Sequence, residues 1–270
     1  MRIPDHSVTG DGPVTIYLFH GAYGSKEYWK FMIGRLVSRG FRVVAWDAPG
    51  YGLSPLPDTV TLQRLADAGA ILVAKTSGER NILFGHSMGG QLAPRIFKRV
   101  GGLIDAIVIS STIGWFGNTS PEDQETFVTE RLGGVSSAAE MKSTTQQVVA
   151  LMLGPNSKSE ECDLVTKVAS STSLITFKAV VAAIKGAGDD EAILAYSGIN
   201  VPTLLLAGEL DKTGKVSGMQ RLSELIKGST LHVVDGVGHY GWAEKPEEVM
   251  AVLERFLSRL NLCSARPISI

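Results

Sequence analysis

Asn81-Ile82-Leu83-Phe84-Gly85-His86-Ser87-Met88-Gly89 is the stretch that decides the fold of this chain. Its first four residues predict a strand, and the residues from Ser87 to Val100 have helical spacing. The segment between strand and helix fits G-x-S-x-G, a sharp turn that exposes a serine hydroxyl at the edge of a sheet. A Cβ atom at either flanking position would collide with neighbouring backbone, which explains the glycines. The pattern therefore predicts that Ser87 is a nucleophile, the alternative being a serine that only caps the helix.

Short β-branched runs alternate with longer amphipathic stretches on both sides of this segment. That alternation predicts β-α-β units on a parallel sheet. Strands are expected over 14–19, 41–46, 81–84, 104–109, 203–207 and 230–234. Helices are expected over 28–37, 87–100 and 215–226, from residue 60, and from Pro246 to near the C-terminus. The predicted fold class is α/β, with a mostly parallel central sheet flanked by helices.

Residues 112–196 interrupt this alternation. Their apolar spacing is helical, and no strong strand pattern occurs among them. A helical insert between two strands of such a sheet is expected to cover the carboxyl ends of the strands as a lid. We therefore expect a core formed by 1–111 and 197–270, interrupted by a helical lid over 112–196.

Composition excludes several classes of protein. The 270 residues carry 26 Lys+Arg and 27 Asp+Glu, a net charge of −1, which argues against a nucleic-acid-binding protein. Cys162 and Cys263 are far apart and lie in no Cys/His cluster, so neither a disulfide framework nor a metal site is expected. The first residues lack the apolar stretch of a secretory signal, and no apolar window is long enough to span a membrane. We expect a cytoplasmic protein.

A nucleophilic serine needs a general base. The candidates are the five histidines of the chain: His6, His20, His86, His232 and His239. His6 is expected in a mobile N-terminus, His20 to brace its loop, His86 to point away from the serine, and His232 to be an ordinary strand residue. His239 follows the last strand, at the same edge of the sheet as Ser87, and is the base that we expect.

The acid that orients this base is expected in the loop after the strand 203–207. That loop carries Glu209 and Asp211, and Asp211 is favoured because it lies deeper in the loop. Asp235, at the end of the last strand, is a less favoured alternative. The strand that ends near Ser110 offers no carboxylate.

An oxyanion would need two backbone N–H donors. One is the residue after the nucleophile, Met88. The other is expected in the glycine-bearing loop after the first strand, at Ala22. The alternative for this loop is a glycine-rich turn that binds nothing.

Together these motifs closely resemble the α/β-hydrolase superfamily. They comprise His20-Gly21 with Trp29 downstream, the segment Asp47-Ala48-Pro49-Gly50-Tyr51-Gly52-Leu53-Ser54, the serine turn, Gly208-Glu209-Leu210-Asp211 and Gly238-His239. The order serine, aspartate, histidine is that of the superfamily. The D-x-P-G-x-G-x-S segment resembles its lid-bearing, small-molecule branch, which includes esterases, lactonases such as 3-oxoadipate enol-lactonase, C–C bond hydrolases and cofactor-free haloperoxidases.

The sequence also departs from parts of this branch. Its epoxide hydrolases and haloalkane dehalogenases use an aspartate nucleophile, and Ser87 argues against both. The loop after His20 lacks the Gly-Pro-Gly and Asn pattern of ring-cleavage C–C hydrolases. Few residues precede the strand 14–19, so the usual leading hairpin is expected to be truncated. Pro94 lies inside the helix after the serine and removes a backbone bond to Gly90.

The resemblance implies a serine hydrolase for a small carboxylic ester or lactone, without a cofactor or metal. The alternatives are a C–C bond hydrolase or lyase with the same triad acting as base, and a small-ligand receptor on a hydrolase scaffold. Substrate contacts are expected from Tyr23, Trp115, Phe116 and Tyr240. Arg131, Lys178 and Lys185 could bind a substrate carboxylate, although a solvated surface position is expected for each. The expected partner is a small-molecule substrate, with neither nucleic acid nor membrane, and a homodimer is left open.

Overall fold

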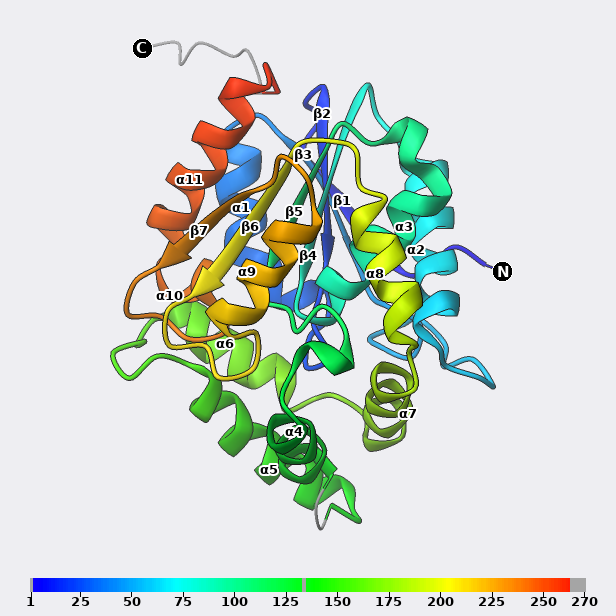
Figure 1. The fold of residues 1–270 in the computed structure, drawn as a ribbon, viewed down its shortest axis with the longest axis vertical. Coiled ribbons are helices and arrows are strands. Elements are labelled where there is room, and N and C mark those ends of the chain that lie inside the picture. The colour runs from blue at the N-terminus through cyan, green and yellow to red at the C-terminus, as the bar shows by residue number, and fades with distance from the viewer. Residues whose placement is uncertain (1, 133–134, 263–270) are drawn as a thin grey trace.

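A seven-stranded sheet with helices on both faces forms the centre of the molecule (Figure 1). The computed structural model describes residues 2–132 and 135–262. The strand order is β1-β3-β2-β4-β5-β6-β7. β1 is antiparallel to β3, and every other neighbouring pair is parallel. The predicted fold class is confirmed.

Most strands lie where the sequence predicts them. Their bounds are β1 His6–Thr9, β2 Val14–Phe19, β3 Arg42–Trp46, β4 Arg80–His86, β5 Ala106–Ser110, β6 Thr203–Gly208 and β7 Thr230–Val234. β1 was not predicted: its four residues are half-buried or exposed, so no apolar run marks it. The expectation of a mobile His6 is wrong, because His6 begins β1 and pairs with Trp46.

From β2 onward, one α-helix separates most consecutive strands, whereas five lie between β5 and β6 in the described residues. The helices are α1 Lys30–Ser38, α2 Leu62–Thr76, α3 Met88–Val100, α4 Pro121–Leu132, α5 Ala138–Met152, α6 Glu160–Ala169, α7 Leu174–Lys185, α8 Asp189–Ser197, α9 Val216–Leu225, α10 Gly241–Glu244 and α11 Pro246–Arg259. Short 3₁₀ turns occur at Lys26–Trp29, Gly101–Leu103 and Phe116–Asn118.

Successive residues of the central strands contribute to two different cores. Ile16 and Leu18 of β2 belong to a cluster with α1 and α11, whereas Tyr17 and Phe19 belong to a cluster with α2, α3 and α9. Side chains alternate between the two faces of a strand. Because both faces are covered, every residue of β2 is apolar or buried, as the continuous apolar run predicts.

Pairing register brings the carboxyl ends of the central strands together. Phe19 at the end of β2 lies opposite Gly85, and His86 at the end of β4 lies opposite Ser110. The loops that follow β2, β4 and β6 therefore leave the sheet at one edge, the edge where open α/β sheets bind their ligands.

The helix after β4 continues through Pro94. Proline removes the bond that the Gly90 carbonyl would otherwise accept, and the Tyr196 hydroxyl of α8 donates to that carbonyl at 2.9 Å. Arg95 of α3 is fully buried and pairs with Glu191 of α8 at 2.8 Å. α8 is thus fixed against α3, on the side of the sheet.

The helices α4 to α7 lie beyond the carboxyl ends of the strands, at the lower end of the molecule in Figure 1. α8 runs back beside α3. This placement is the one expected of a lid, and the lid and its bounds at 112–196 stay a prediction.

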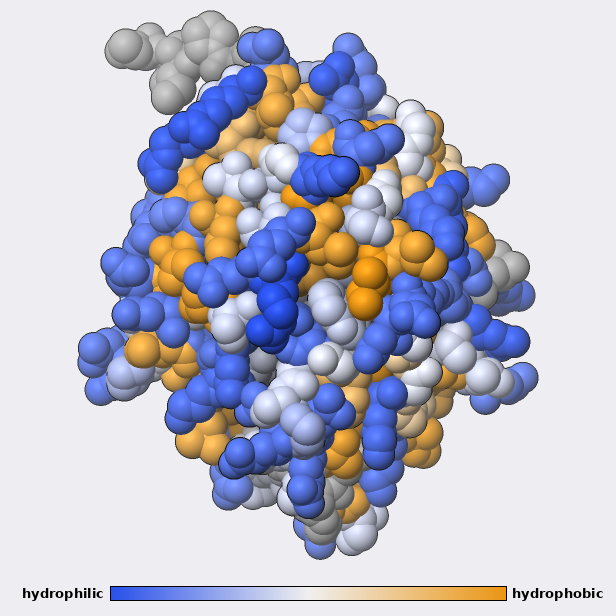
Figure 2. Space-filling model, viewed as in Figure 1, coloured by the Kyte–Doolittle hydropathy of each residue, from blue (hydrophilic) through white to orange (hydrophobic). Residues whose placement is uncertain are grey.

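Hydrophilic side chains are spread over the face that carries α8 and α9, with hydrophobic ones between them (Figure 2). Within the described ranges no single helix is long and apolar enough to cross a membrane, and the one pair that passes together, α6 with α7, is bent by 94°. Cys162 is a buried free thiol; Cys263 lies outside the described residues.

Candidate active site

Ser87 lies on a strained turn between β4 and α3. Its backbone has φ 54° and ψ −112°, a conformation that a residue with a side chain adopts only when its surroundings hold it there. Its N–H donates to the Ser110 carbonyl at 2.9 Å. A Cβ on Gly85 would lie 2.2 Å from the Gly89 carbonyl oxygen, and one on Gly89 would lie 2.0 Å from the Phe19 carbonyl oxygen. The turn therefore requires both glycines, as the sequence predicts.

His239 and Asp211 form a buried pair at the same edge of the sheet. His239 Nδ1 lies 2.8 Å from Asp211 Oδ2, and the two residues are 1% and 5% exposed. A carboxylate only accepts hydrogen bonds, so Nδ1 carries a proton and donates it to Asp211. Neutral His239 in this tautomer has its Nε2 lone pair available to accept a proton.

The Asp211 carboxylate is held on both oxygens. Oδ1 accepts from the N–H groups of Thr213 at 2.8 Å and Gly214 at 2.9 Å. Burial alone would raise the pKa of Asp211, but the charge and hydrogen bond of His239 and the two backbone donors lower it below its usual value. Glu209 is exposed and accepts from the Gly236 N–H, away from His239.

Ser87 and His239 line one small cavity of about 20 Å³. Tyr23, Met88 and Tyr240 line it as well. Within the described ranges, no hydrogen bond joins the Ser87 hydroxyl to His239. In structures without substrate, catalytic hydrogen bonds are often longer than in the substrate complex.

The two predicted oxyanion donors both border this cavity. Met88 is the first residue of α3, where a backbone N–H has no acceptor within the helix. The peptide unit that carries the Ala22 N–H is held from its other side, because His20 Nδ1 donates to the Gly21 carbonyl at 2.8 Å. The Tyr51 hydroxyl donates to the Ala22 carbonyl at 2.9 Å, and the Gly21 N–H donates to Tyr28. The loop is thus fixed by the side chains of His20, Tyr28 and Tyr51.

His20 is a neutral brace of this loop, as expected from the sequence. Its Nδ1 contacts a carbonyl, which only accepts, and its Nε2 accepts from the Ala48 N–H at 3.0 Å. Both contacts require the neutral Nδ1–H tautomer. Complete burial lowers the pKa of His20 to about 4.

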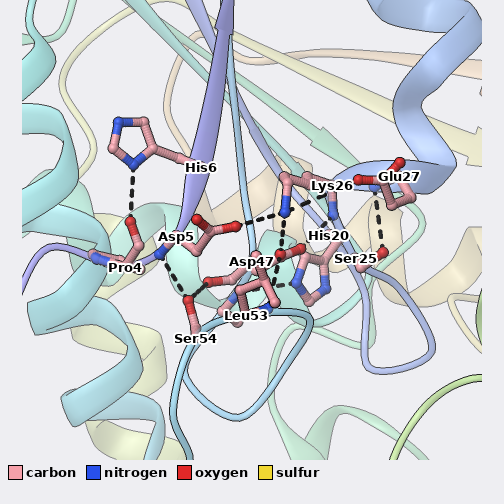
Figure 3. A network of polar contacts seen from close by, with 11 residues as sticks. Pro4, Asp5, His6, His20, Ser25, Lys26, Glu27, Asp47, Leu53 and Ser54 are labelled. Atoms are coloured by element: carbon pink, nitrogen blue, oxygen red, sulfur yellow. Dashed lines mark hydrogen bonds and ion pairs between the residues drawn. The ribbon is translucent and has the colours of Figure 1, made fainter.

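An ion-pair network lies beside His20 and ties the N-terminal segment to the loop after β3 (Figure 3). Lys26 Nζ lies 2.6 Å from Asp5 and 2.5 Å from Asp47. Ser54 donates to the Asp47 carbonyl and accepts from the Asp5 N–H. The D-x-P-G-x-G-x-S segment therefore supports the loop that carries Gly21 and Ala22 through its contacts with His20 and Ala22. The segment does not line the cavity beside Ser87.

The other histidines, His6, His86 and His232, do not line the cavity beside Ser87. His86 is completely buried, and its ring centroid lies 4.8 Å from that of His239. Burial lowers the pKa of His86 well below its usual value. His232 of β7 lies 3.6 Å from Glu248 of α11. His6 Nδ1 contacts the Pro4 carbonyl.

The loop that carries His239 is held by residues that the sequence reasoning missed. The His239 N–H donates to the Met152 carbonyl at the end of α5, at 2.7 Å. The Glu244 carboxylate accepts from the N–H groups of Gly238, Tyr240 and Gly154. Glu244 had no local signal, because only folding brings these donors around it.

Three of the four predicted substrate contacts lie at a cavity. Tyr23 and Tyr240 line the space beside Ser87, and Phe116 lines a neighbouring cavity of about 280 Å³. Trp115 lines neither; its ring centroid is 6.3 Å from that of Tyr196. The two cavities share five lining residues: Ile113, Phe127, Arg131, Met152 and Thr213.

The expected surface position is wrong for Arg131, which is only 4% exposed and lines both cavities. Lys178 and Lys185 are exposed and line neither of the two. In the part of the chain that the structure describes, no cluster of three His, Cys, Asp or Glu side chains could hold a metal ion.

Several known proteins are similar to this chain. Protein ABHD8 of Bos taurus is 26% identical over 247 residues, which are 90% of this chain and 56% of that protein. This chain thus spans about half the length of that relative. The esterase EaEST from Exiguobacterium antarcticum superimposes with a TM-score of 0.81 at 17% identity, covering 94% of both chains. The enol-lactonase from Burkholderia xenovorans LB400 has a TM-score of 0.78 at 20% identity, covering 94% of this chain and 96% of that chain.

At these identities, the likeness to the two solved structures shows the fold alone. The model of the alpha/beta hydrolase family matches residues 16–252, from β2 to α11, which is well over half of this chain. This match includes the serine turn, the loops that carry Asp211 and His239, and the helices between β5 and β6. The chain therefore belongs to the alpha/beta hydrolase family.

Proposed function

We propose that this protein is a serine hydrolase that cleaves a small carboxylic ester or lactone. The observation that carries the proposal is the buried His239–Asp211 pair, 2.8 Å apart, on the same cavity as the strained Ser87. A serine hydroxyl is a weak nucleophile until a base removes its proton. Here a base with a fixed tautomer lies beside it.

In the proposed mechanism, His239 Nε2 takes the proton of the Ser87 hydroxyl as the oxygen attacks the substrate carbonyl. The negative charge that develops on the carbonyl oxygen is stabilised by the N–H groups of Ala22 and Met88. His239 then gives its proton to the departing alkoxide, which leaves an acyl-enzyme on Ser87. Water activated by His239 hydrolyses this ester, and Asp211 stabilises the imidazolium in both steps.

The size of the site favours a small substrate. The cavity beside Ser87 measures about 20 Å³, and the neighbouring one about 280 Å³. α4 and α5 contribute Phe127, Arg131 and Met152 to both cavities. We infer that these helices act as a lid that selects the substrate and excludes water during acyl transfer.

Labelling with a fluorophosphonate probe, followed by turnover of p-nitrophenyl acetate and a panel of lactones, tests this function. The wild-type protein should be labelled and should hydrolyse at least one ester or lactone, and Ser87→Ala should do neither. Ser197→Ala, at an exposed serine of α8, is the matched control and should behave like wild type.

Two other outcomes would contradict the proposal. Absence of both labelling and turnover would indicate a small-ligand receptor. Cleavage of a C–C bond without an acyl-enzyme on Ser87 would indicate that the triad acts only as a base.

A further inference from the structure

Gln91 is a buried amide that lies one helical turn after the nucleophile. It is the fourth residue of α3, and its N–H donates to the Ser87 carbonyl at 3.3 Å. Side chains four residues apart in a helix lie on the same face, with their Cβ atoms about 5–6 Å apart. Gln91 is 3% exposed and lines the cavity of about 20 Å³ together with Ser87 and His239. Its side chain therefore lies within reach of a substrate group close to the scissile bond.

The side-chain amide of Gln91 has no hydrogen-bond partner among residues 2–132 and 135–262. Only its backbone groups are paired, the N–H with Ser87 and the carbonyl with Arg95 Nη1 at 2.7 Å. The amide is also not enclosed by protein, unlike the unpaired indole N–H groups of Trp29 and Trp242. A buried amide that has given up its bonds to water is unfavourable until a new partner binds. Gln91 thus presents an unused donor and an unused acceptor to the cavity.

The Tyr240 hydroxyl is a second uncharged group at this cavity. Tyr240 is 2% exposed, lines the cavity with Gln91, and has no hydrogen bond from its hydroxyl in the described part of the chain. Burial raises the pKa of Tyr240, so that the hydroxyl keeps its proton and remains a donor. The side chains that α7 contributes, Val181 and Ile184, are aliphatic and cannot pair with either group. A bound substrate can supply the partners of both.

We propose that Gln91 and Tyr240 form a polar subsite for an uncharged hydroxyl of the substrate, a few bonds away from the scissile carbonyl. This inference rests on the serine hydrolase function proposed above. A hydroxyl both donates and accepts, so it can donate to Gln91 Oε1 and accept from Gln91 Nε2 or from Tyr240. A carboxylate only accepts and would leave Gln91 Oε1 unpaired, and an alkyl group would leave both side chains unpaired. The substrate class is therefore a small hydroxy ester or hydroxy lactone.

Pairs of substrates that exchange a hydroxyl for a methyl group test the proposal. Ethyl 3-hydroxybutyrate is compared with ethyl 3-methylbutyrate, and α-hydroxy-γ-butyrolactone with α-methyl-γ-butyrolactone, with the enantiomers of each chiral compound assayed separately. We expect wild-type kcat/KM to be higher by about tenfold or more for one hydroxy compound than for its methyl partner, because a site that binds a hydroxyl rejects analogues that lack it.

Gln91→Leu keeps the approximate size of the side chain and removes its polar atoms. It should lower the hydroxyl-to-methyl ratio by about tenfold or more, and Tyr240→Phe should lower the ratio in the same direction. The intrinsic reactivity of each compound cancels when the ratio is compared between wild type and variant. Gln220→Leu, at an exposed glutamine of α9, is the matched control and should not change the ratio.

Thermal stability separates a substrate contact from a structural role. Loss of an unpaired buried amide should keep or raise the Tm of Gln91→Leu, whereas loss of a structural contact would lower it. Ethyl 3-hydroxybutyrate should raise the Tm of Ser87→Ala, which cannot hydrolyse it, and should fail to raise that of Ser87→Ala/Gln91→Leu.

The proposal would be overturned by a wild-type enzyme without preference for the hydroxy compounds, by an unchanged ratio in Gln91→Leu, by a lower Tm of this variant, or by equal ligand shifts in the two Ser87→Ala proteins. The hydrolase function is judged separately, by whether hydrolysis of the methyl compounds requires Ser87. If none of the compounds is hydrolysed, the hydrolase proposal fails, and the two Ser87→Ala proteins still decide whether the subsite binds a hydroxyl.

Discussion

Replacing Asp211 by asparagine tests the triad most directly, because the structure dictates how the new side chain must lie. Asp211 Oδ1 accepts from the N–H groups of Thr213 and Gly214, and Oδ2 accepts from His239 Nδ1. In Asp211→Asn, the amide oxygen must take the Oδ1 place, since an NH₂ group there would face two donors. The amide nitrogen then lies against His239 and donates to it.

This arrangement inverts the tautomer of the base. His239 Nδ1 would become an acceptor, so that the neutral ring carries its proton on Nε2 and cannot accept one from Ser87. In a serine protease, the same exchange lowers kcat about 10⁴-fold. We expect a loss of about 10³- to 10⁴-fold in kcat, or about 4 to 5 kcal/mol in activation free energy. The side chain keeps its size and two of its hydrogen bonds, so the variant should still fold.

The assay is hydrolysis of p-nitrophenyl acetate at neutral pH, with far-UV circular dichroism and Tm to establish folding. Glu209→Gln is the matched control, because Glu209 is an exposed carboxylate of the same loop that contacts Gly236 and not His239. It should stay within about twofold of wild type. A folded Asp211→Asn protein with more than a tenth of wild-type kcat would refute the assignment of Asp211.

Three further predictions concern the oxyanion loop and its support. Gly21→Ala should lower kcat/KM at least tenfold, because its Cβ would lie 3.0 Å from the Cβ and 3.5 Å from the hydroxyl of the nucleophile, whereas Gly34→Ala, with no atom within 4 Å of its Cβ, should keep activity and gain stability by up to ~1 kcal/mol. Tyr51→Phe removes the 2.9 Å bond to the Ala22 carbonyl and should lower kcat about fivefold, the equivalent of about 1 kcal/mol. Burial holds the pKa of His20 at about 4, below its ordinary 6.5. As the pH falls, the unfolded chain therefore takes up the proton on His20 before the folded protein does. His20 should lower the free energy of unfolding by about 3 kcal/mol as the pH falls from 6.5 to 4. Urea unfolding at pH 7.5, 5.5 and 4.5 should show a smaller loss in His20→Gln than in wild type, and equal losses would contradict it.

Local patterns account for what the sequence predicted well. The bounds 14–19 and 230–234 coincide with β2 and β7, because an apolar β-branched run between turn residues is a short-range signal. The serine turn is also local, since its glycines are required by backbone within a few residues or on the next strand. Asp211 and His239 could be singled out because loops at the carboxyl ends of parallel strands meet at one edge.

What the sequence could not predict depends on tertiary position. β1 has no apolar run and exists through its pairing with β3. Arg131 reads as an ordinary surface cation of an amphipathic helix, and only the placement of α4 over the sheet buries it. Trp115 is a large aromatic residue of the kind that often lines pockets, yet in the structure its ring packs near that of Tyr196.

The bond between the His239 N–H and the Met152 carbonyl makes access to the site and the position of the base depend on each other. A motion that lifted the end of α5 from the sheet would break this bond, and Glu244 would have to release either Gly154 or the N–H groups of the histidine loop. Opening on that side would therefore displace His239 as the substrate enters. The end of α5 therefore serves as a fixed anchor for the loop that carries His239.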